Sequence, residues 1–285
     1  MNRDRKKKMS GKHLRIQMFA GMMAGVLITA LLYKPFCYEI VVCVSQTAAE
    51  RAADIASFHA VSGYGLEAEN MVMQVVYQLA RRSVVKVVVK DFTGNGIIWK
   101  IDDEIVIVSN KHLLGKDVKA EIVFCNGETF HADIMGYSQQ YDIGFARIAE
   151  TAVSNSVLRE IYEAVPVLYE VDSEEKRETF AQNWAGKRIL QTGAAAGQRV
   201  ADFSLGTVRG IRFVPLFNTM VLETDCFSRA GMSGGGVFEE SGRLLGMISG
   251  GDVPENAGQR EAEVTYSIPP ALIAAEYEML IQSVH

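Results

Sequence analysis

Short apolar stretches recur along the chain from residue 83 to about residue 268, and Gly, Asn, Asp and Ser separate them. The first, SVVKVVV, is rich in β-branched residues, and GIIWKIDDEIVIVSN places two strand-like segments around the turn signal Asp102-Asp103. We expect GNG at residues 94–96 to be a tight turn. The later stretches are AEIVF, ADIMGY, IGFARI, RILQTG, LGTVRGI, TMVLETD, GGVFEE and LLGMISGG. Many short strands at this spacing are typical of an antiparallel barrel or sandwich, so the pattern predicts an all-β domain.

Helical patterns flank and interrupt these strands. Residues 46–82 are rich in Ala, Glu, Met and Gln, which predicts one or two helices. These helices would form either a stalk between a membrane and the domain or a layer packed on its outside. A polar, helix-prone insert near 149–186 divides the strands into two sets. Residues 269–285 begin with prolines and have helical apolar spacing, so we expect a closing helix.

The amino-terminal region has the composition of a membrane anchor. A basic segment, residues 1–15, precedes the apolar run MFAGMMAGVLITALLY, which with its flanks approaches the roughly 18–20 residues that span a bilayer. The positive-inside rule predicts a single-pass protein of the cell membrane, with residues 1–15 cytoplasmic, a signal-anchor at 16–34, and a linker or stalk at 35–82 leading to an extracytoplasmic domain. The alternatives are a cleaved signal peptide and a buried core helix, but no small-x-small cleavage site follows the run.

Charge and cysteine content limit the expected partners. Residues 1–15 carry seven basic residues and one acidic residue, a net charge of +6. Because the net charge of the whole chain is −5, the remaining residues carry −11. Such an acidic body argues against nucleic acid as a partner. Cys37, Cys43, Cys125 and Cys226 allow three disulfide pairings or remain free thiols, and neither a CxxC motif nor a Cys/His cluster occurs. We therefore expect neither a metal nor a cofactor.

The strongest local motif is GMSGGG at residues 231–236, which contains Ser233. A serine hydroxyl becomes a nucleophile when a base takes its proton, and the oxyanion that then develops needs backbone N–H donors. Glycines allow the tight turn that presents such donors. On its own, however, a run of this kind is more often a flexible loop.

The order of the histidines along the chain discriminates between serine-hydrolase folds. In α/β-hydrolases the histidine follows the serine, and here only the terminal His285 does so. In the other order, histidine and aspartate precede the serine. His112 follows the strand-like EIVIVSN, where a rigid scaffold can aim a side chain, whereas His13, His59 and His131 lie in the basic tail, the helical segment and a polar strand.

Five larger sequence blocks follow one another along the chain: GNGIIW, IVIVSNKHLL, ADIMGYSQQYDIGFARI, LGTVRGI, and ETDCFSRAGMSGGGVF with GRLLGMISG. In this order and spacing they resemble the HtrA/DegP-like serine proteases of the trypsin-like (chymotrypsin-fold) superfamily, over about residues 80–275. The resemblance implies two packed antiparallel six-stranded β-barrels, at about 83–150 and 187–268, with a linker at about 150–186 and the closing helix at 269–285. It also implies a serine endopeptidase, here without the PDZ domain common in the group.

The resemblance also assigns the catalytic residues. The family's histidine falls on His112, its aspartate on Asp142 and its nucleophile on Ser233. His112 would take the proton of Ser233 and later return it to the leaving amine, while Asp142 would hold the imidazole and stabilise its charged form. Asp133 is the second candidate for the acid.

The oxyanion hole would consist of the backbone N–H groups of Gly231 and Ser233, with Met232 as a third candidate. This chain departs from the family at two positions beside the nucleophile. Met232 stands where HtrA-type proteases usually have asparagine, and Gly236 stands where proline is usual. The effect of Met232 on the oxyanion loop, and hence on resting activity, stays open at this point.

The primary specificity pocket would be lined by Phe227, Ser249, Gly250 and Gly251. An apolar residue at its base disfavours cleavage after Lys or Arg and favours a small or medium apolar residue before the scissile bond. Asp225 belongs to the Thr-Asp pair of the resembling motif, so we expect it to be structural rather than a specificity residue.

These features predict a membrane-anchored serine endopeptidase that cleaves unfolded or signalling proteins outside the cytoplasm. Its partners would be protein or peptide substrates and the membrane, and assembly into a homo-oligomer is compatible with the sequence. The main alternative is a catalytically silent trypsin-like module that serves as a binding or scaffold protein. A membrane-anchored esterase or acyltransferase would share the same nucleophile.

Overall fold

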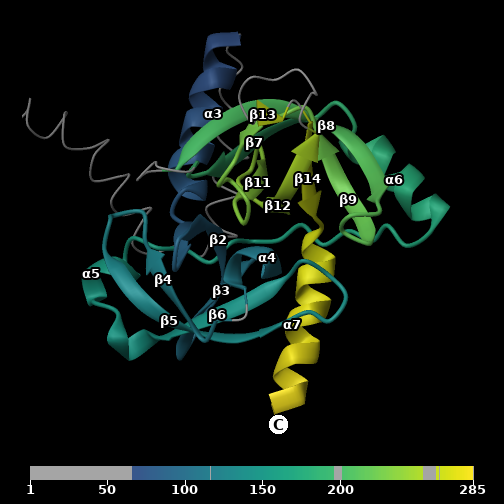
Figure 1. Ribbon diagram of the computed structural model, residues 1–285. Helices are drawn as coiled ribbons and strands as arrows, with labels where there is room; N and C mark the ends of the chain where they lie inside the picture. The colour runs from purple at the N-terminus through teal and green to yellow at the C-terminus, as the bar shows by residue number, and fades with distance from the viewer. Residues whose placement is uncertain (1–65, 116, 196–200, 253–260, 263, 285) are drawn as a thin grey trace, which may run out of the picture. The chain divides into compact units, whose positions relative to one another are not determined.

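The computed structural model describes residues 66–284 except for residues 116, 196–200, 253–260 and 263. Two closed barrels, each of six antiparallel strands, form most of this part of the chain, which confirms the predicted two-barrel architecture (Figure 1). The predicted transmembrane segment at 16–34 lies outside the described residues. Of the helices that the structure describes, none is both long enough and apolar enough to cross a bilayer.

The first barrel contains β1 (Val84–Val89), β2 (Phe92–Ile101), β3 (Glu104–Ser109), β4 (Lys119–Val123), β5 (Thr129–Tyr137) and β6 (Gly144–Ala149). The strand order is β1-β2-β3-β6-β5-β4, and pairing of β1 with β4 closes the barrel. Alternation along β1 buries Val85, Val87 and Val89 in one apolar cluster, as expected for a strand with one face in the core. A one-turn helix, α4 (Lys111–Leu114), follows β3.

The second barrel contains β7 (Arg188–Gly193), β8 (Asp202–Val214), β9 (Thr219–Thr224), β11 (Gly236–Glu239), β12 (Leu244–Asp252) and β14 (Val264–Ile268). The strand order is β11-β12-β14-β9-β8-β7, and pairing of β11 with β7 closes this barrel. β10 (Ser228–Arg229), which follows β9, and β13 (Glu261–Ala262), which lies between β12 and β14 in the sequence, pair in a small two-stranded sheet. The segment that carries Ser233 connects β10 to β11.

The linker between the barrels contains short helices rather than strands. These are η1 (Glu150–Ala152), α5 (Asn155–Leu158) and α6 (Glu174–Trp184). The N-cap of α6 is Ser173, whose hydroxyl accepts a hydrogen bond from the backbone N–H of Lys176. Phe180 on α6 is buried in the same apolar cluster as Ile189 and Val208 of the second barrel. Val167, Tyr169 and Trp184 pack against the same cluster, so the helix-prone insert contacts the second barrel through several apolar side chains.

An apolar cluster joins the two barrels. It contains Ile97, Val108 and Phe145 of the first barrel together with Leu190, Phe238 and Met247 of the second. Helix α3 (Leu66–Ala80) contributes Val72, Met73 and Val76 to this same cluster, each at most 2 % exposed. Residues 66–80 therefore differ from a free-standing stalk: they are helical, but their apolar face is buried against the barrels. Residues 35–65 of the suggested stalk lie outside the described residues.

The closing helix is α7 (Pro270–Val284), as the sequence predicts. Its Ile273 is fully buried in the cluster between the barrels, and the ring of Tyr277 lies 5.4 Å from that of Phe145 on β6. The chain thus returns from the second barrel to cover the first (Figure 1).

The GNG segment at residues 94–96 is not a turn, and that prediction was wrong. These residues lie inside β2, where Gly94, Asn95 and Gly96 pair with Val87, Lys86 and Val85 of β1. Both positions need glycine because neighbouring atoms leave no room for a Cβ atom. A Cβ atom on Gly94 would lie 2.5 Å from Leu113 Cδ2 and 3.0 Å from the carbonyl oxygen of Ser233.

Candidate active site

His112 and Asp142 form a hydrogen-bonded pair at the end of the first barrel. His112 lies on α4, directly after β3, and Asp142 precedes β6, where the neighbouring Ile143 is fully buried. Asp142 Oδ2 is 2.7 Å from His112 Nδ1, and Asp142 Oδ1 accepts the backbone N–H of His112 at 2.9 Å. With an ionised carboxylate as partner, Nδ1 carries the proton and Nε2 is the free acceptor. This is the tautomer that a general base needs.

Two polar side chains hold Asp142 in place. Ser249 on β12 donates its hydroxyl proton to Asp142 Oδ2 at 3.2 Å. Asn110, the residue before α4, donates from Nδ2 to Ser249 Oγ at 2.5 Å and to the backbone oxygen of Asp142 at 3.2 Å. Because Ser249 belongs to the second barrel and Asn110 and Asp142 to the first, these contacts fix the acid across the interface. Asp133, the second candidate for the acid, lies on β5 with its side chain 68 % exposed.

Ser233 lies in a loop that the glycines around it make unusually tight. Gly231 has φ +92° and Gly234 has φ +83°, conformations that favour glycine. Gly94 of β2 is close both to Leu113, the residue after His112, and to the backbone oxygen of Ser233. The structure therefore brings the loop of Ser233 to the same edge of the first barrel as His112. No hydrogen bond between described residues joins the Ser233 hydroxyl to the His112 ring, and catalytic contacts of this kind are often long until a substrate is bound.

The backbone of the serine loop presents two free donors. Neither the N–H of Gly231 nor that of Ser233 donates to an acceptor within the part of the chain that the structure describes. The N–H of Met232 donates to the carbonyl oxygen of Arg229 at 3.1 Å, so the suggestion of Met232 as a third oxyanion donor was wrong. The thioether of Met232 is buried and accepts the N–H of Arg229 at 3.3 Å. Met232 thus closes the turn before the nucleophile instead of facing the substrate.

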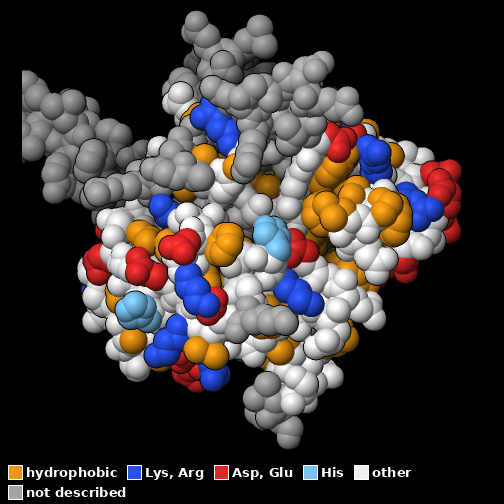
Figure 2. Space-filling view, viewed as in Figure 1, with side chains coloured by type: hydrophobic (Ala, Val, Ile, Leu, Met, Phe, Trp, Pro, Cys, Tyr) orange, Lys and Arg blue, Asp and Glu red, His pale blue; other side chains and the backbone are white. Residues whose placement is uncertain are grey.

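A cleft with a volume of about 790 Å³ extends from His112 and Asp142 along the second barrel. Ser249, Gly250 and Gly251 line it, as the sequence suggests for the substrate-binding strand. The β8–β9 hairpin forms its apolar wall, and Leu216 at the tip is 84 % exposed. Figure 2 shows hydrophobic side chains gathered over β8 and β9. The remaining lining residues are Lys111, Tyr141, Val214, Pro215, Phe217, Asp252 and Tyr266.

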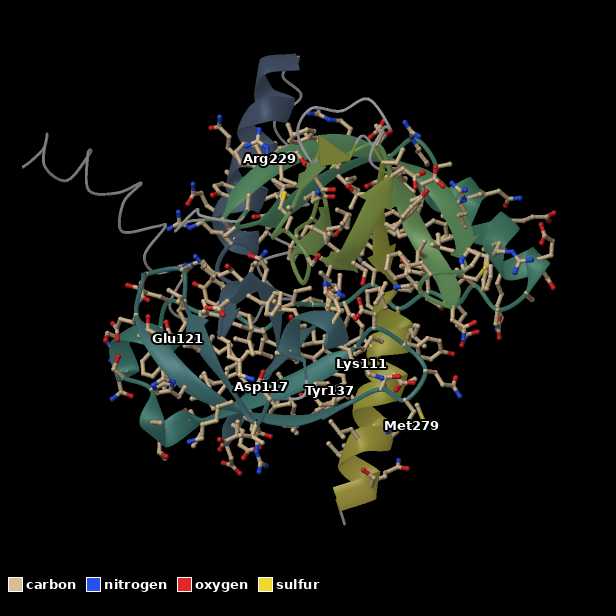
Figure 3. All side chains as sticks on the ribbon, viewed as in Figure 1. Lys111, Asp117, Glu121, Tyr137, Arg229 and Met279 are labelled. Carbon is tan, nitrogen blue, oxygen red and sulfur yellow. The ribbon has the colours of Figure 1, made fainter. Side chains whose placement is uncertain are left out.

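Phe227, the expected base of the specificity pocket, does not line this cleft. Its backbone oxygen accepts hydrogen bonds from Gln191 Nε2 and Ser204 Oγ, both at 3.0 Å. The guanidinium of Arg229 lies 4.9 Å from the centre of its ring. Figure 3 labels Lys111 at the start of α4 and Arg229 on β10, which belongs to the small two-stranded sheet rather than to a barrel.

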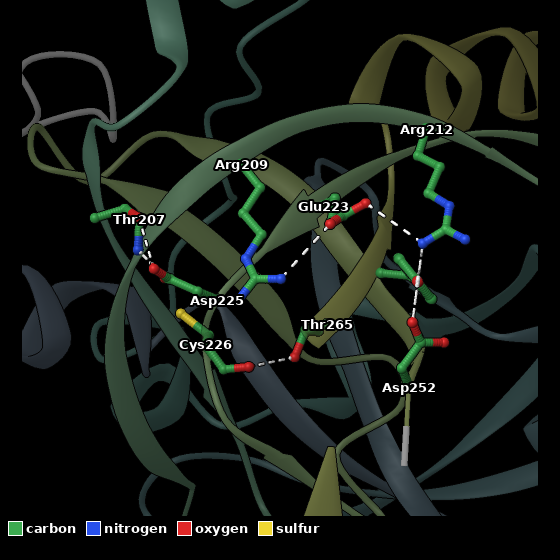
Figure 4. A network of polar contacts seen from close by, with 9 residues as sticks. Thr207, Arg209, Arg212, Glu223, Asp225, Cys226, Asp252 and Thr265 are labelled. Atoms are coloured by element: carbon green, nitrogen blue, oxygen red, sulfur yellow. Dashed lines mark hydrogen bonds and ion pairs between the residues drawn. The ribbon is translucent and has the colours of Figure 1, made fainter. Parts of the chain in front are cut away.

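Polar contacts stabilise the wall of the second barrel behind the cleft (Figure 4). Asp225 accepts hydrogen bonds from the backbone N–H and the hydroxyl of Thr207, which accords with a structural role. Tyr266 donates to Asp252 Oδ2 at 2.6 Å and accepts from Arg212 at 2.9 Å. Burial and the neighbouring carboxylate raise the pKa of Tyr266 to about 12, so its hydroxyl stays protonated. Cys125 and Cys226 are free thiols, and Cys37 and Cys43 lie outside the described residues.

The predictions from sequence did not identify the residues that support the catalytic site. Asn95 was assigned to a turn, Ser249 to substrate contact alone, and Asn110 to no role. A signal for Asn95 was present, because a polar residue between two glycines in a strand indicates close backbone approach. Ser249 is more than 100 residues from both Asn110 and Asp142, so local sequence patterns contain no sign of these contacts.

A pair of closed antiparallel barrels, with a His–Asp pair on one and a glycine-flanked serine on the other, is the arrangement typical of a two-barrel serine peptidase domain. The chain belongs to the trypsin-like peptidase domain family, whose model matches residues 94–247. The predicted enzyme class, a serine endopeptidase, agrees with the peptidase domain that this family model describes.

Individual relatives carry HtrA-type names, which confirms the resemblance found in the sequence. Protease Do-like 1, chloroplastic, of Arabidopsis thaliana is 26% identical over 192 residues, which cover 67% of this chain and 39% of that protein. The chain thus spans well under half the length of this relative. Among solved structures, the HtrA-type protease AlgW with tripeptide has a TM-score of 0.59 at 15% identity, covering 74% of this chain and 64% of that one. The inactive form of the Rv3671c protease of M. tuberculosis has a TM-score of 0.55 at 15% identity, covering 74% and 94%.

Proposed function

We propose that this chain hydrolyses peptide bonds with Ser233 as nucleophile, His112 as general base and acid, and Asp142 as the orienting carboxylate. The observation that carries the proposal is the pair of hydrogen bonds from Asp142 to His112, 2.7 Å to Nδ1 and 2.9 Å to the backbone N–H. Two bonds fix both the position and the tautomer of the ring. The side chain of His112 is 54 % exposed, so its free Nε2 is accessible to a substrate.

The reaction proceeds through an acyl-enzyme. Ser233 Oγ attacks the carbonyl carbon of the scissile bond while Nε2 of His112 takes the hydroxyl proton. The N–H groups of Gly231 and Ser233 stabilise the oxyanion of the tetrahedral intermediate, and one such donor contributes about 3–4 kcal/mol of barrier reduction. His112 then protonates the leaving amine. Water, activated by the same Nε2, attacks the ester and restores the Ser233 hydroxyl.

We propose that the substrate is an extended, apolar segment of a protein. Gly250 and Gly251 on β12 line the cleft beside His112, and glycines allow a substrate backbone to approach a strand closely. The apolar wall at Leu216 and Phe217 favours hydrophobic side chains on the amino-terminal side of the scissile bond. We also propose a small or medium apolar residue directly before that bond, and the support is the resemblance in sequence, since Phe227 does not line this cleft. Unfolded or signalling proteins supply such segments.

We further propose that a signal-anchor at residues 16–34 holds the enzyme in the cell membrane with its barrels outside the cytoplasm. The support is the basic segment followed by an apolar run in the sequence, and these residues lie outside the described part of the chain. Fusions of alkaline phosphatase and of a green fluorescent protein to the carboxyl terminus test the orientation. Active phosphatase with a dark fluorescent fusion supports it, and the reverse pattern contradicts it.

The catalytic proposal is tested with a fluorophosphonate probe, which labels an activated serine covalently. Native full-length chain, Ser233→Ala and Ser156→Ala are compared, and Ser156 is suitable as a control because it is an exposed serine on α5. We expect labelling of the native chain and of Ser156→Ala, and none of Ser233→Ala. Labelling that survives in Ser233→Ala contradicts the assignment.

The second candidate function is a catalytically silent module that binds proteins through the same cleft. The observation in its favour is that no described hydrogen bond joins Ser233 to His112. It predicts that the native chain binds apolar peptides but is not labelled by the probe and cleaves neither peptides nor simple esters. Cleavage of esters without peptides would instead indicate an esterase.

A further inference from the structure

We propose that Asn95 is a positioning residue of the catalytic site, because its side-chain amide fixes the peptide that orients the oxyanion donors. The inference rests on the proposed peptidase function. Asn95 belongs to the first barrel and is only 1 % exposed, whereas the partners of its side-chain amide belong to the second barrel. It is therefore a polar group inserted from one barrel into the loop of the nucleophile on the other.

The amide of Asn95 uses both its donor and its acceptor. Nδ2 donates to the backbone oxygen of Gly231 at 2.7 Å and to that of Ala194 at 3.1 Å. Oδ1 accepts the backbone N–H of Ala194 at 2.7 Å. Ala194 directly follows β7, so the bidentate contact holds the amide against the end of a barrel strand. An amide held in this way is a rigid support for the third partner, Gly231.

The contact with Gly231 determines the orientation of the peptide between Gly231 and Met232. Its carbonyl is bound to Asn95, and its N–H is bound to the carbonyl oxygen of Arg229 at 3.1 Å. The preceding peptide, between Ala230 and Gly231, has neither of its polar atoms bonded to a described residue. The N–H of this peptide belongs to Gly231 and is the first oxyanion donor. Its direction is therefore set by the backbone conformation of Gly231. Asn95 is the side chain that holds this backbone.

The backbone of Asn95 also contacts the nucleophile Ser233 and the strand that leads to the base His112. Its N–H donates to the carbonyl oxygen of Ser233 at 2.8 Å, and its carbonyl accepts the hydroxyl of Ser109 at 2.6 Å. Ser109 ends β3, three residues before His112. One residue thus contacts the loop of the oxyanion hole, the nucleophile and the strand that presents the base.

The geometry requires an amide rather than another polar group at this position. Aspartate has the same shape but offers no donor to the carbonyl oxygens of Gly231 and Ala194, and it would face both of them with negative charge. Serine is neutral but too short to bridge both partners. In either variant the backbone bonds of residue 95 to Ser233 and Ser109 can remain.

The test compares steady-state kinetics of the full-length chain with Asn95→Asp and Asn95→Ser, and with Asn126→Asp as the matched control. Asn126 lies in the exposed turn between β4 and β5, where its side chain forms hydrogen bonds with Glu128, its partner among the described residues. Removal of a complete oxyanion donor costs about 10²–10³ in kcat, so a misaligned donor is expected to cost about 10- to 100-fold. KM is expected to change by less than about threefold, because the cleft is untouched.

Two further readouts separate positioning from general stability. A peptide boronate forms a tetrahedral adduct with the serine, so its affinity should fall by the same factor as kcat in both variants. The acidic limb of the pH profile of kcat/KM should stay in place, because the contact between His112 and Asp142 is not altered. Native far-ultraviolet circular dichroism and an unfolding transition above the assay temperature establish that each variant is folded.

The inference is overturned if a folded Asn95 variant keeps kcat within about threefold of the native chain, or if the loss lies in KM. Absence of fluorophosphonate labelling in the native chain indicates failure of the proposed function instead. In that case amide hydrogen exchange decides the positioning role. Exchange of the Ala194 and Met232 amides should be at least about tenfold faster in Asn95→Ser, and unchanged exchange contradicts the role.

Discussion

Replacement of Asp142 by asparagine tests the catalytic arrangement most directly. The carboxylate has two distinct tasks, since Oδ1 accepts the backbone N–H of His112 at 2.9 Å and Oδ2 faces the ring Nδ1 at 2.7 Å. In Asp142→Asn the side-chain oxygen must remain opposite the backbone N–H, because the alternative places two donors against each other. The new NH₂ group therefore faces Nδ1 of His112 and the hydroxyl of Ser249, 3.2 Å from Oδ2 in the native chain.

This orientation forces the wrong tautomer on His112. Nδ1 must accept a hydrogen bond from the new amide, so the proton of the neutral ring moves to Nε2. An Nε2 that already carries a proton cannot take one from Ser233. In the general serine-protease triad this substitution lowers kcat by about 10⁴. At about 1.36 kcal/mol for each factor of ten, the expected loss of transition-state stabilisation is about 5.5 kcal/mol.

The assay measures kcat with a fluorogenic apolar peptide and the rate of fluorophosphonate labelling for the native chain, Asp142→Asn and Asp133→Asn. Asp133→Asn is the matched control, because that carboxylate is exposed on β5 and its nearest cation, Lys119, is 4.0 Å away. We expect a loss of about 10⁴ for Asp142→Asn and less than about twofold for Asp133→Asn. An Asp142→Asn variant within tenfold of native activity refutes the assigned role of this carboxylate, and a large loss in Asp133→Asn transfers the role to the other acid.

Three further changes follow from contacts in the structure. Ser249→Ala removes a donor to Asp142 and should lower kcat about 5- to 30-fold, from about 1–2 kcal/mol of lost orientation, and recovery in Ser249→Thr would distinguish the hydroxyl from packing. Burial raises the pKa of Glu239, but hydrogen bonds from Ser241 and Arg243 outweigh it and hold that pKa below its ordinary value of 4.5. Its stabilisation is thus present above about pH 4.5 and is lost as pH falls through the folded pKa, so urea unfolding should show Glu239→Gln about 1–3 kcal/mol less stable at pH 7, with a smaller difference in acid. Burial raises the pKa of Cys226 to about 12, so only about 10⁻⁴ of this thiol is ionised at pH 8, and peptide mapping should find it alkylated by iodoacetamide only after unfolding.

The two-barrel fold could be predicted from the sequence because its strands are marked locally. β1 contains five valines in six residues, and the turn after β2 falls on Asp102-Asp103. The position of α3 could not be predicted in this way. An amphipathic helix shows that one face is buried but not against what, and both a stalk and a packed helix satisfied the pattern. Its partners, such as Leu190 and Phe238, are more than 100 residues away.

The candidate triad was accessible from the sequence because His112, Asp142 and Ser233 each lie in a distinctive block. The residues that hold the triad were not accessible, since their roles arise only from folding. Asn95 was misassigned because Gly-Asn-Gly is a frequent turn sequence. Only the folded structure shows why both glycines lie in a strand: Leu113 and the Ser233 backbone approach Gly94, and Ile107 approaches Gly96. Met232 was misassigned for a similar reason, because its N–H is used by the carbonyl oxygen of Arg229.

The contacts that support the site also determine how the two barrels fit together. The apolar cluster between them is tolerant of small shifts, because burial of apolar area has no direction. Hydrogen bonds from Asn95 to Ala194 and Gly231, and from Asn110 to Ser249, have strict lengths and join buried atoms of opposite barrels. A shift of one barrel by 1 Å would leave these buried groups unpaired, at about 1–3 kcal/mol each. The alignment of base, acid and nucleophile therefore follows from the same polar contacts that exclude other packings of the barrels.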